Sequence, residues 1–181
     1  MPEVSPLARQ ALHYWKRLYG ERQGLLLIPG GGAEGDAVYF AQAGFDVIVV
    51  DPSGDALERL EVLAREARVG LTSVQCPLEV YRFPVPVSMV HTYNALQFLG
   101  ERCVSYLQRL QSGTSAGGMH SVSVYMRGEA PVQAGAYCME HDELKFLYRG
   151  WRLLLYTEQT LWDDAVQQYL SLAQIIAVKP G

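Results

Sequence analysis

The chain has 181 residues, of which 49% are hydrophobic and 19% are charged, and its formal net charge is −4. This composition is that of an ordinary globular protein, and it excludes intrinsic disorder, which combines low hydrophobicity with high net charge. The slight negative charge and the lack of a lysine- or arginine-rich run argue against nucleic acid or an anionic membrane surface as a partner. We therefore expect a single domain over residues 1–181 that acts on a small molecule.

The first 20 residues predict an amphipathic helix that precedes a core over residues 24–181. Ser5 is a suitable N-cap, Pro6 fits the first helical position, and apolar residues recur at helical spacing until Gly20. The start of the chain lacks the basic and apolar regions of a signal peptide, and no apolar run approaches the roughly 20 residues of a membrane helix. These features favour a cytoplasmic location.

Strands and helices then alternate along the chain. The apolar run Leu25–Ile28 ends in Pro29 and three glycines, as expected for a strand buried on both faces of a sheet. The same reasoning predicts helices at 35–43 and 55–67, strands at 45–50, 71–76 and 87–91, a continuous helix over 96–110, a glycine-containing loop over 113–118 and a strand at 119–126.

The last third of the chain has a different pattern. It predicts a short helix at 142–149, a strand at 151–158, a polar turn around Asp163 and Asp164, and a final strand at 168–179. Two strands that are joined without a helix form an antiparallel pair. We therefore predict a three-layer α/β fold with one seven-stranded sheet, mostly parallel, that ends in an antiparallel hairpin.

The glycine turn after the first strand and the acid after the second are the first candidate site. Gly30, Gly31 and Gly32 would let the backbone approach a ligand closely, because glycine has no Cβ. Asp51 would lie beside this turn at the carboxyl edge of the sheet, where a carboxylate can accept hydrogen bonds from the two ribose hydroxyls of a nucleoside. The alternative role for Asp51 is to cap the helix that begins near residues 52–54.

A dinucleotide cofactor is a second interpretation of the same glycines. Gly30, Gly32 and Gly35 match the G-x-G-x-x-G pattern of NAD- and FAD-binding proteins. The motif alone is weak, the distance from Gly30 to Asp51 is short for such folds, and the chain has no room for a separate catalytic domain. An oxidoreductase is therefore the less favoured alternative.

The segment from Leu26 to Asp51 resembles the cofactor half of tellurite-resistance-type methyltransferases, and Pro29 and Asp36 resemble the corresponding loop of thiopurine-type methyltransferases. A second match includes Asp142-Glu143-Leu144, Gly150-Trp151, Tyr156 and Glu158, which are similar to the pattern before and within the sixth strand of the tellurite-resistance group. The resemblance covers roughly residues 25–180. It implies a Rossmann-like methyltransferase fold, S-adenosylmethionine as cofactor, and methyl transfer to a soft sulfur, selenium or tellurium nucleophile or another small acceptor. Among cofactor-binding residues it implies Gly30, Gly31, Gly32, Asp36, Asp51, Pro52, Pro77, Leu78 and His91.

The sequence departs from this family at two cofactor contacts. Ile28 stands where the family carries an acid before the glycine turn, and the segment after the third strand lacks the acid that receives the adenine amino group. Glu79, or the backbone of Pro77 and Leu78, would have to replace the second contact. These departures keep open a catalytically inactive binding or regulatory protein of the same fold.

The end of the fourth strand supplies the candidate catalytic residues His91, Tyr93 and Asn94, which this fold brings close to the transferred methyl group; a buried, structurally satisfied histidine is the alternative for His91. Tyr14 and Trp15 are either a lid over the acceptor or part of the core. The histidines and cysteines show no ligand spacing, so we expect no metal site. A homodimer remains open.

Overall fold

A computed structural model describes residues 3–30, 34–84, 86–128, 135–163 and 167–181 of the chain. Its centre is a seven-stranded sheet in the order β3-β2-β1-β4-β5-β7-β6. The strands are β1 (Leu25–Pro29), β2 (Asp46–Asp51), β3 (Thr72–Gln75), β4 (Val87–Tyr93), β5 (Thr114–Tyr125), β6 (Arg152–Asp163) and β7 (Gln168–Val178). The first five pair in parallel, and β7 is antiparallel to both β5 and β6, which confirms the predicted fold class.

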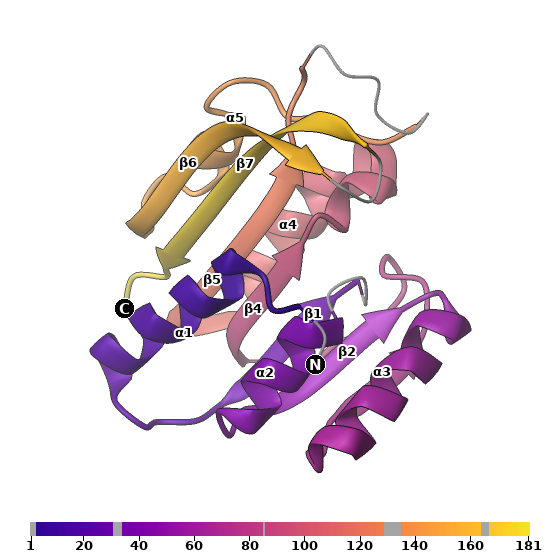
Figure 1. Cartoon of the computed structure of the whole chain (residues 1–181). Helices are drawn as coiled ribbons and strands as arrows, with labels where there is room; N and C mark the ends of the chain where they lie inside the picture. Colours follow the sequence, from indigo (N-terminus) through magenta and orange to yellow (C-terminus); the bar gives the residue numbers. More distant parts are fainter. Residues whose placement is uncertain (1–2, 31–33, 85, 129–134, 164–166) are drawn as a thin grey trace.

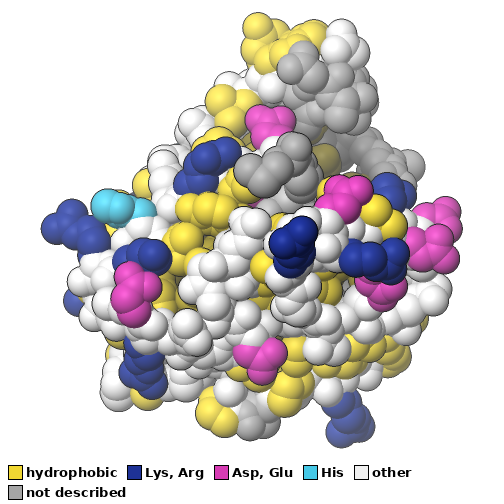
Figure 2. Space-filling view, turned by 60° about the horizontal axis from the view of Figure 1, so that its bottom comes forward, with side chains coloured by type: hydrophobic (Ala, Val, Ile, Leu, Met, Phe, Trp, Pro, Cys, Tyr) yellow, Lys and Arg dark blue, Asp and Glu magenta, His cyan; other side chains and the backbone are white. Residues whose placement is uncertain are grey.

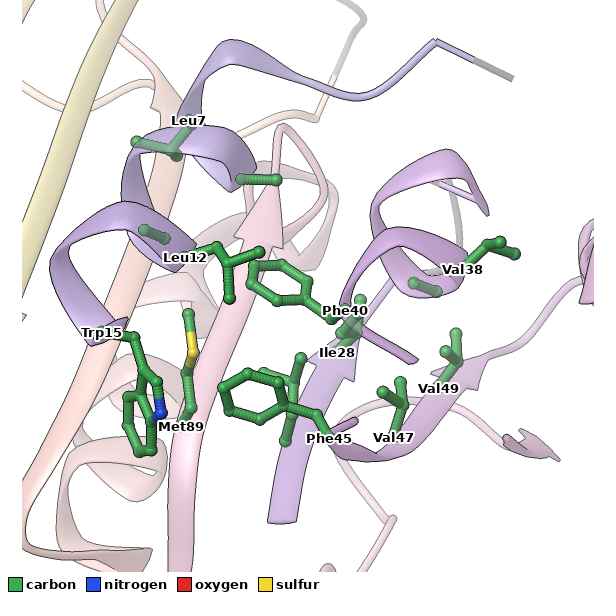
Figure 3. Close-up of a cluster of buried hydrophobic side chains, with 14 of the residues drawn as sticks. Leu7, Leu12, Trp15, Ile28, Val38, Phe40, Phe45, Val47, Val49 and Met89 are labelled. Carbon is green, nitrogen blue, oxygen red and sulfur yellow. The ribbon is translucent and has the colours of Figure 1, made fainter. Parts of the chain in front are cut away.

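Three helices cover one face of the sheet: α1 (Pro6–Tyr19), α2 (Glu34–Gln42) and α3 (Gly54–Ala67) (Figure 1). The Ser5 hydroxyl accepts a hydrogen bond from the Ala8 amide at 3.1 Å, and Gly20, at φ 63°, ends α1, so the predicted caps are confirmed. Figure 3 shows how the apolar side of α1 contacts the sheet, with Trp15 beside Phe45 and Met89. Ile28 lies in the same cluster and is 1% exposed.

The opposite face is covered by a 3₁₀ helix, η1 (Leu96–Arg102), by α4 (Cys103–Gly113) and by the short helix α5 (Glu143–Leu147). Val90 and Val122 of the sheet pack there against Leu107 and other buried side chains of α4. The sheet therefore separates two apolar cores, as its central parallel strands require.

Two predicted elements differ from the structure. The helix expected over 96–110 is broken, because Gly100 adopts φ 57° and ψ −137°, and 3₁₀ geometry precedes α4. The expected loop over Gly113–Gly118 belongs mainly to β5, which begins at Thr114. The polar turn predicted at Asp163 and Asp164 lies partly outside the described residues, since β6 extends to Asp163.

Surface charge is mixed on the face shown in Figure 2, where acidic and basic side chains alternate without a large cluster of either sign. This distribution fits the weak net charge of −4. Within the described part of the chain, no helix has the length and apolar character needed to cross a bilayer.

Candidate active site

A cavity of about 500 Å³ lies at the carboxyl end of the parallel strands. It is formed by the residues that follow β1, β2, β3 and β4, the edge at which open α/β sheets bind their ligands. Its lining residues are Gly30, Asp51, Pro52, Pro77, Leu78, Glu79, Asn94, Ala95, Phe98 and Leu99. Seven of these, Gly30, Asp51, Pro52, Pro77, Leu78, Glu79 and Asn94, are sequence-predicted site residues. Gly31 and Gly32 fall outside the described residues.

Gly30 has a structural reason to be glycine that does not involve a ligand. Its φ is 90°, and a Cβ at this position would lie 2.3 Å from the Cβ of Ala95. Its amide donates a hydrogen bond to the Val50 carbonyl at 2.8 Å, which joins the end of β1 to the end of β2. The glycine therefore lets the turns after β1 and β4 approach each other at the floor of the cavity.

Asp51 is half-buried at the end of β2, with its carboxylate at the cavity. Its Oδ1 accepts a hydrogen bond from the Ser53 amide at 2.7 Å. The N-cap of α3 is Ser53, whose hydroxyl accepts from the Ala56 amide at 3.3 Å. Asp51 is therefore not the N-cap residue of α3, but its carboxylate accepts from the amide of that N-cap residue, and this contact orients it.

Two loops form opposite walls of the cavity. Pro52 follows β2, and its carbonyl accepts a hydrogen bond from the side-chain amide of Gln75 at 3.3 Å. Pro77 and Leu78 follow β3, and Leu78 is only 6% exposed because it also belongs to the core under α4. Pro52, Pro77 and Leu78 give these walls apolar surface that suits a flat heteroaromatic ring, and Glu79 adds a carboxylate to the wall after β3.

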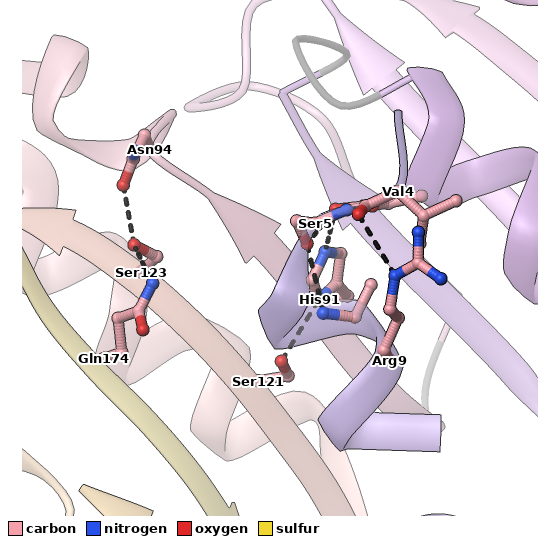
Figure 4. Close-up of polar contacts among 10 residues, drawn as sticks. Val4, Ser5, Arg9, His91, Asn94, Ser121, Ser123 and Gln174 are labelled. Carbon is pink, nitrogen blue, oxygen red and sulfur yellow. Dashed lines mark hydrogen bonds and ion pairs between the residues drawn. The ribbon is translucent and has the colours of Figure 1, made fainter. Parts of the chain in front are cut away.

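Asn94 occupies the end of β4 with φ 50°, a left-handed conformation that asparagine tolerates. Its amide donates to the Ser123 carbonyl at 2.9 Å, and its Oδ1 accepts from the Ser123 hydroxyl at 2.6 Å. The side chain of Gln174 donates to the same hydroxyl at 3.3 Å (Figure 4). Asn94 is therefore held in one position at the cavity by β5 and β7, while Tyr93 is half-buried against the core under α1.

His91 and Asp36 do not line the cavity. They are 0% and 1% exposed, and His91 Nε2 is 2.9 Å from Asp36 Oδ2. His91 Nδ1 is 3.1 Å from the Ser121 hydroxyl, so both ring nitrogens have partners (Figure 4). The amide and hydroxyl of Ser5 each donate to Asp36 at 2.7 Å. The structure therefore places both residues in a buried pair outside the described lining of the cavity, an arrangement that fits the alternative of a structurally satisfied histidine at His91.

Electrostatics at this buried pair favours the ionised carboxylate. Burial alone would raise the pKa of Asp36, but the hydrogen bonds from His91 and Ser5 and the attraction of His91 outweigh it, so the pKa lies below its ordinary value.

The lid interpretation of Tyr14 and Trp15 is wrong, since Trp15 is 4% exposed and its ring nitrogen donates to the Arg22 carbonyl at 2.7 Å. Both side chains pack in or against the core.

The family-like residues of the last third lie together away from the cavity. Glu158 accepts a hydrogen bond from the Asp142 amide at 2.7 Å and contacts the Tyr156 hydroxyl and the His141 ring. Burial raises the pKa of Glu158 and these hydrogen bonds lower it, with a net decrease. The donor atoms of His141, Asp142 and Glu158 lie within 4.8 Å of one another, a grouping that the sequence spacing did not indicate. Glu158 already bonds to Tyr156 and to the Asp142 backbone, so these contacts connect the start of α5 to β6.

Sequence reasoning missed Phe98 and Arg109. Phe98 is 53% exposed at the rim of the cavity, where its ring is 6.2 Å from that of Tyr125. Arg109 projects from α4 toward the backbone behind the cavity wall. A helical apolar pattern indicates which residues face the core, but it does not indicate that a polar member of that face reaches a distant loop.

The model of the tellurite resistance protein TehB family matches residues 22–162, which is most of the chain. The chain belongs to the TehB family. TehB from Haemophilus influenzae has a similar structure, with a TM-score of 0.81 and 17% identity over 94% of this chain. The chain spans 62% of the length of that protein.

Two further solved structures share the fold of this TehB-family chain. One is the Burkholderia thailandensis 1,6-didemethyltoxoflavin-N1-methyltransferase with bound 1,6-didemethyltoxoflavin and S-adenosylhomocysteine, with a TM-score of 0.69 and 20% identity over 97% of this chain and 79% of that one. The other is the Synechocystis magnesium protoporphyrin IX methyltransferase with bound S-adenosylhomocysteine, with a TM-score of 0.72 and 15% identity over 95% and 81% of the two chains. A search of curated proteins returned no match.

Proposed function

We propose that this protein binds S-adenosylmethionine in the cavity at the ends of β1 to β4 and transfers its methyl group to a small molecule. The observation that carries the proposal is the convergence of Gly30, Asp51 and Leu78 on one cavity of about 500 Å³ in a TehB-family fold. Membership of this family and the bound S-adenosylhomocysteine of two proteins with the same fold support the choice of cofactor.

The residues of the cavity fit the cofactor. Asp51 offers a carboxylate, fixed by the Ser53 amide, for the two ribose hydroxyls. Pro52, Pro77 and Leu78 offer apolar walls for the adenine ring, and Glu79 or the loop backbone offers an acceptor for its amino group. Ile28 has no part in this site because it is buried under α1, so the position of the family's acid is part of the core here.

The cofactor, when bound, supplies an electrophilic methyl group on a sulfonium. The protein's part is to orient the two reactants and exclude water, which can provide much of the rate acceleration for an acceptor that is already a good nucleophile. Asn94 lies at the cavity and is fixed by Ser123, so we assign it to the acceptor side. Tyr93, half-buried next to it, belongs to the same strand end. A soft sulfur, selenium or tellurium anion is the acceptor class we propose, because it needs no general base.

Calorimetric titration with S-adenosylmethionine and S-adenosylhomocysteine tests the proposal, with NAD as a control ligand. We expect micromolar dissociation constants that Asp51→Asn raises at least about tenfold, equivalent to roughly 1.4 kcal/mol. Asp46→Asn is the matched control, since Asp46 is an exposed residue at the opposite end of β2. Binding of neither compound would contradict the proposal, and binding of NAD alone would support the oxidoreductase alternative.

Turnover is tested separately from binding. Sulfide, selenide and telluride are incubated with the protein and methyl-labelled cofactor, and the methylated thiol, selenol or tellurol is measured by mass spectrometry. Product formation that Asp51→Asn reduces supports the acceptor class. Tight cofactor binding without product from these or other small nucleophiles would favour the inactive binding protein.

A further inference from the structure

The wall of the cavity after β3 is a short irregular segment of backbone, residues 77–81. The amides of Val80 and Tyr81 donate to the Pro77 carbonyl at 3.2 and 3.3 Å, so the segment folds into one tight turn. Pro77 and Leu78 of this turn line the cavity. A turn of this kind leaves its later carbonyls outside any regular hydrogen-bond pattern, so they need other donors.

Arg109 of α4 supplies these donors. Its Nη1 donates to the Glu79 carbonyl at 2.7 Å, and its Nη2 donates to the Leu78 carbonyl at 2.8 Å and to the Tyr81 carbonyl at 3.2 Å. A guanidinium is suited to this task because its donors are fixed in one plane. One side chain thus joins three carbonyls of the turn to a helix on the other side of the wall.

The guanidinium is itself held in place by aromatic rings. It lies 4.8 Å from the centre of the Tyr106 ring and 5.6 Å from that of Phe83. Tyr106 is 4% exposed in the core under α4, which fixes the platform on which Arg109 lies. Arg102 adds an ion pair to the Glu79 side chain at 2.7 Å, although Arg102 itself is largely exposed.

We infer that Arg109 is a positioning residue that shapes the cavity wall for the cofactor, an inference that rests on the function proposed above. The acid that the family carries after β3 is missing, so recognition on this side of the cavity depends on Leu78 and on the position of the loop, through either its backbone or the Glu79 side chain. A loop of this kind binds a ligand more tightly when it is ordered before the ligand arrives, since ordering a loop on binding reduces affinity. Arg109 orders the wall without touching the cofactor.

Three variants test this role by calorimetry and by thermal unfolding. Arg109→Gln removes the charge and most of the donors, and Arg109→Lys keeps the charge but not the planar geometry. Lys179→Gln is the matched control, because Lys179 also donates to two backbone carbonyls, those of Gln111 at 2.8 Å and Thr114 at 2.7 Å, remote from the cavity. We expect Arg109→Gln to raise the dissociation constant for S-adenosylhomocysteine about tenfold or more, with Arg109→Lys intermediate. Lys179→Gln lowers the melting temperature but leaves this constant unchanged.

Hydrogen exchange of the ligand-free proteins separates this inference from the function on which it rests. We expect faster exchange at residues 78–83 in Arg109→Gln, with the strands still protected. Equal affinity of the wild type and Arg109→Gln, or equal loss of affinity in Lys179→Gln, would overturn the inference alone. A wild type that binds neither cofactor compound overturns both proposals, and faster exchange would then leave Arg109 only a structural role.

Discussion

Two buried histidines on opposite faces of the sheet show how the surroundings decide what the same side chain does. His91 of β4 lies on the α1 face and His120 of β5 lies on the α4 face, and both are 0% exposed. His91 contacts a carboxylate, Asp36, whereas both ring nitrogens of His120 contact hydroxyl groups: its Nε2 is 2.7 Å from the Thr114 Oγ1 and its Nδ1 is 2.6 Å from the Tyr148 hydroxyl. One face therefore contains an imidazole beside an ionised carboxylate and the other a neutral hydrogen-bond chain.

The chain of contacts around His120 fixes its protonation state. The Thr114 hydroxyl donates to the Leu110 carbonyl at 2.7 Å, so its oxygen accepts from His120 Nε2, and the Tyr148 hydroxyl then donates to Nδ1. Burial, together with the positive charge of Lys179, lowers the pKa of His120 to about 3. The two faces therefore differ in the partner that burial imposes on the imidazole: an ionised carboxylate at His91 and two hydroxyl groups at His120.

Replacing the Asp36 carboxylate is expected to have the largest effect on stability. Asp36→Asn leaves His91 and the two Ser5 donors without their anionic acceptor, and removing one partner of a buried pair typically costs about 3–5 kcal/mol. We expect a loss of unfolding free energy of this size in urea denaturation. The control is Glu34→Gln, because the Glu34 partner Arg59 is 63% exposed. We expect this variant to lose less than about 1 kcal/mol of unfolding free energy. Similar losses for the two variants would show that the buried pair contributes nothing special.

The pH dependence of stability tests whether His120 is neutral in the folded protein. Between pH 6.5 and about 3 the unfolded chain binds a proton at His120 that the folded protein does not bind, so this contribution to stability is complete above pH 6.5 and is lost as the pH falls. Asp36, whose pKa is lowered, adds a second loss once the pH falls below the ordinary range of an aspartate.

We expect His120→Gln to lose about 1–3 kcal/mol at pH 7, the cost of disturbing buried hydrogen bonds, and less at pH 4.5. Urea denaturation at both pH values measures the difference. His13→Gln, at an exposed position of α1, is the control and leaves the pH profile as it is. A His120→Gln profile parallel to that of the wild type would refute the assigned neutral state.

The smallest effect on stability is expected at Ser5, which we compare with Ser53. Its hydroxyl both caps α1 and donates to Asp36, whereas the Ser53 hydroxyl only caps α3. An N-cap serine replaced by alanine costs about 1 kcal/mol. We therefore expect Ser5→Ala to destabilise the protein by about 1–2 kcal/mol and more than Ser53→Ala, as measured by urea denaturation. Equal losses would mean that the hydrogen bond to Asp36 makes no net contribution.

Most of the fold could be predicted because local signals agree with the final packing. The Ser5-Pro6 start and Gly20 end of α1, and the apolar run of β1, are encoded within a few residues. The break at Gly100 could not be predicted in the same way, since Leu96, Leu99 and Cys103 keep an apolar spacing through the 3₁₀ segment.

The glycines before Met119 misled for the opposite reason. They are typical of a loop, yet Gly118 lies within β5. It is packed so closely that a Cβ there would be 2.5 Å from the Thr114 side chain. Close packing, which the sequence pattern does not reveal, requires the glycine at this position.

The residues of the candidate site likewise differ in whether local sequence signals predict their position. The cavity residues Gly30, Asp51 and Asn94 were predictable because parallel strands bring their carboxyl ends to one edge. A buried, satisfied histidine was one of the two interpretations of His91, but its pairing with Asp36 could not be predicted, because the two residues are 55 positions apart and only the folded packing brings them together. Arg109 escaped prediction for the same reason, since its partners lie on a loop about 30 residues away.

The place of β7 in the sheet has a consequence for how the chain folds. β7 follows β6 along the chain but lies between β5 and β6, and β6 has β7 as its neighbour in the described sheet. Until β7 is present, β6 has no partner and the edge of β5 is open, so the chain cannot complete the sheet in the order in which it is made. Contacts that join distant parts of a chain form slowly and leave strand edges exposed meanwhile. The insertion of β7 is therefore the step at which we expect folding to be slowest and aggregation to compete most strongly.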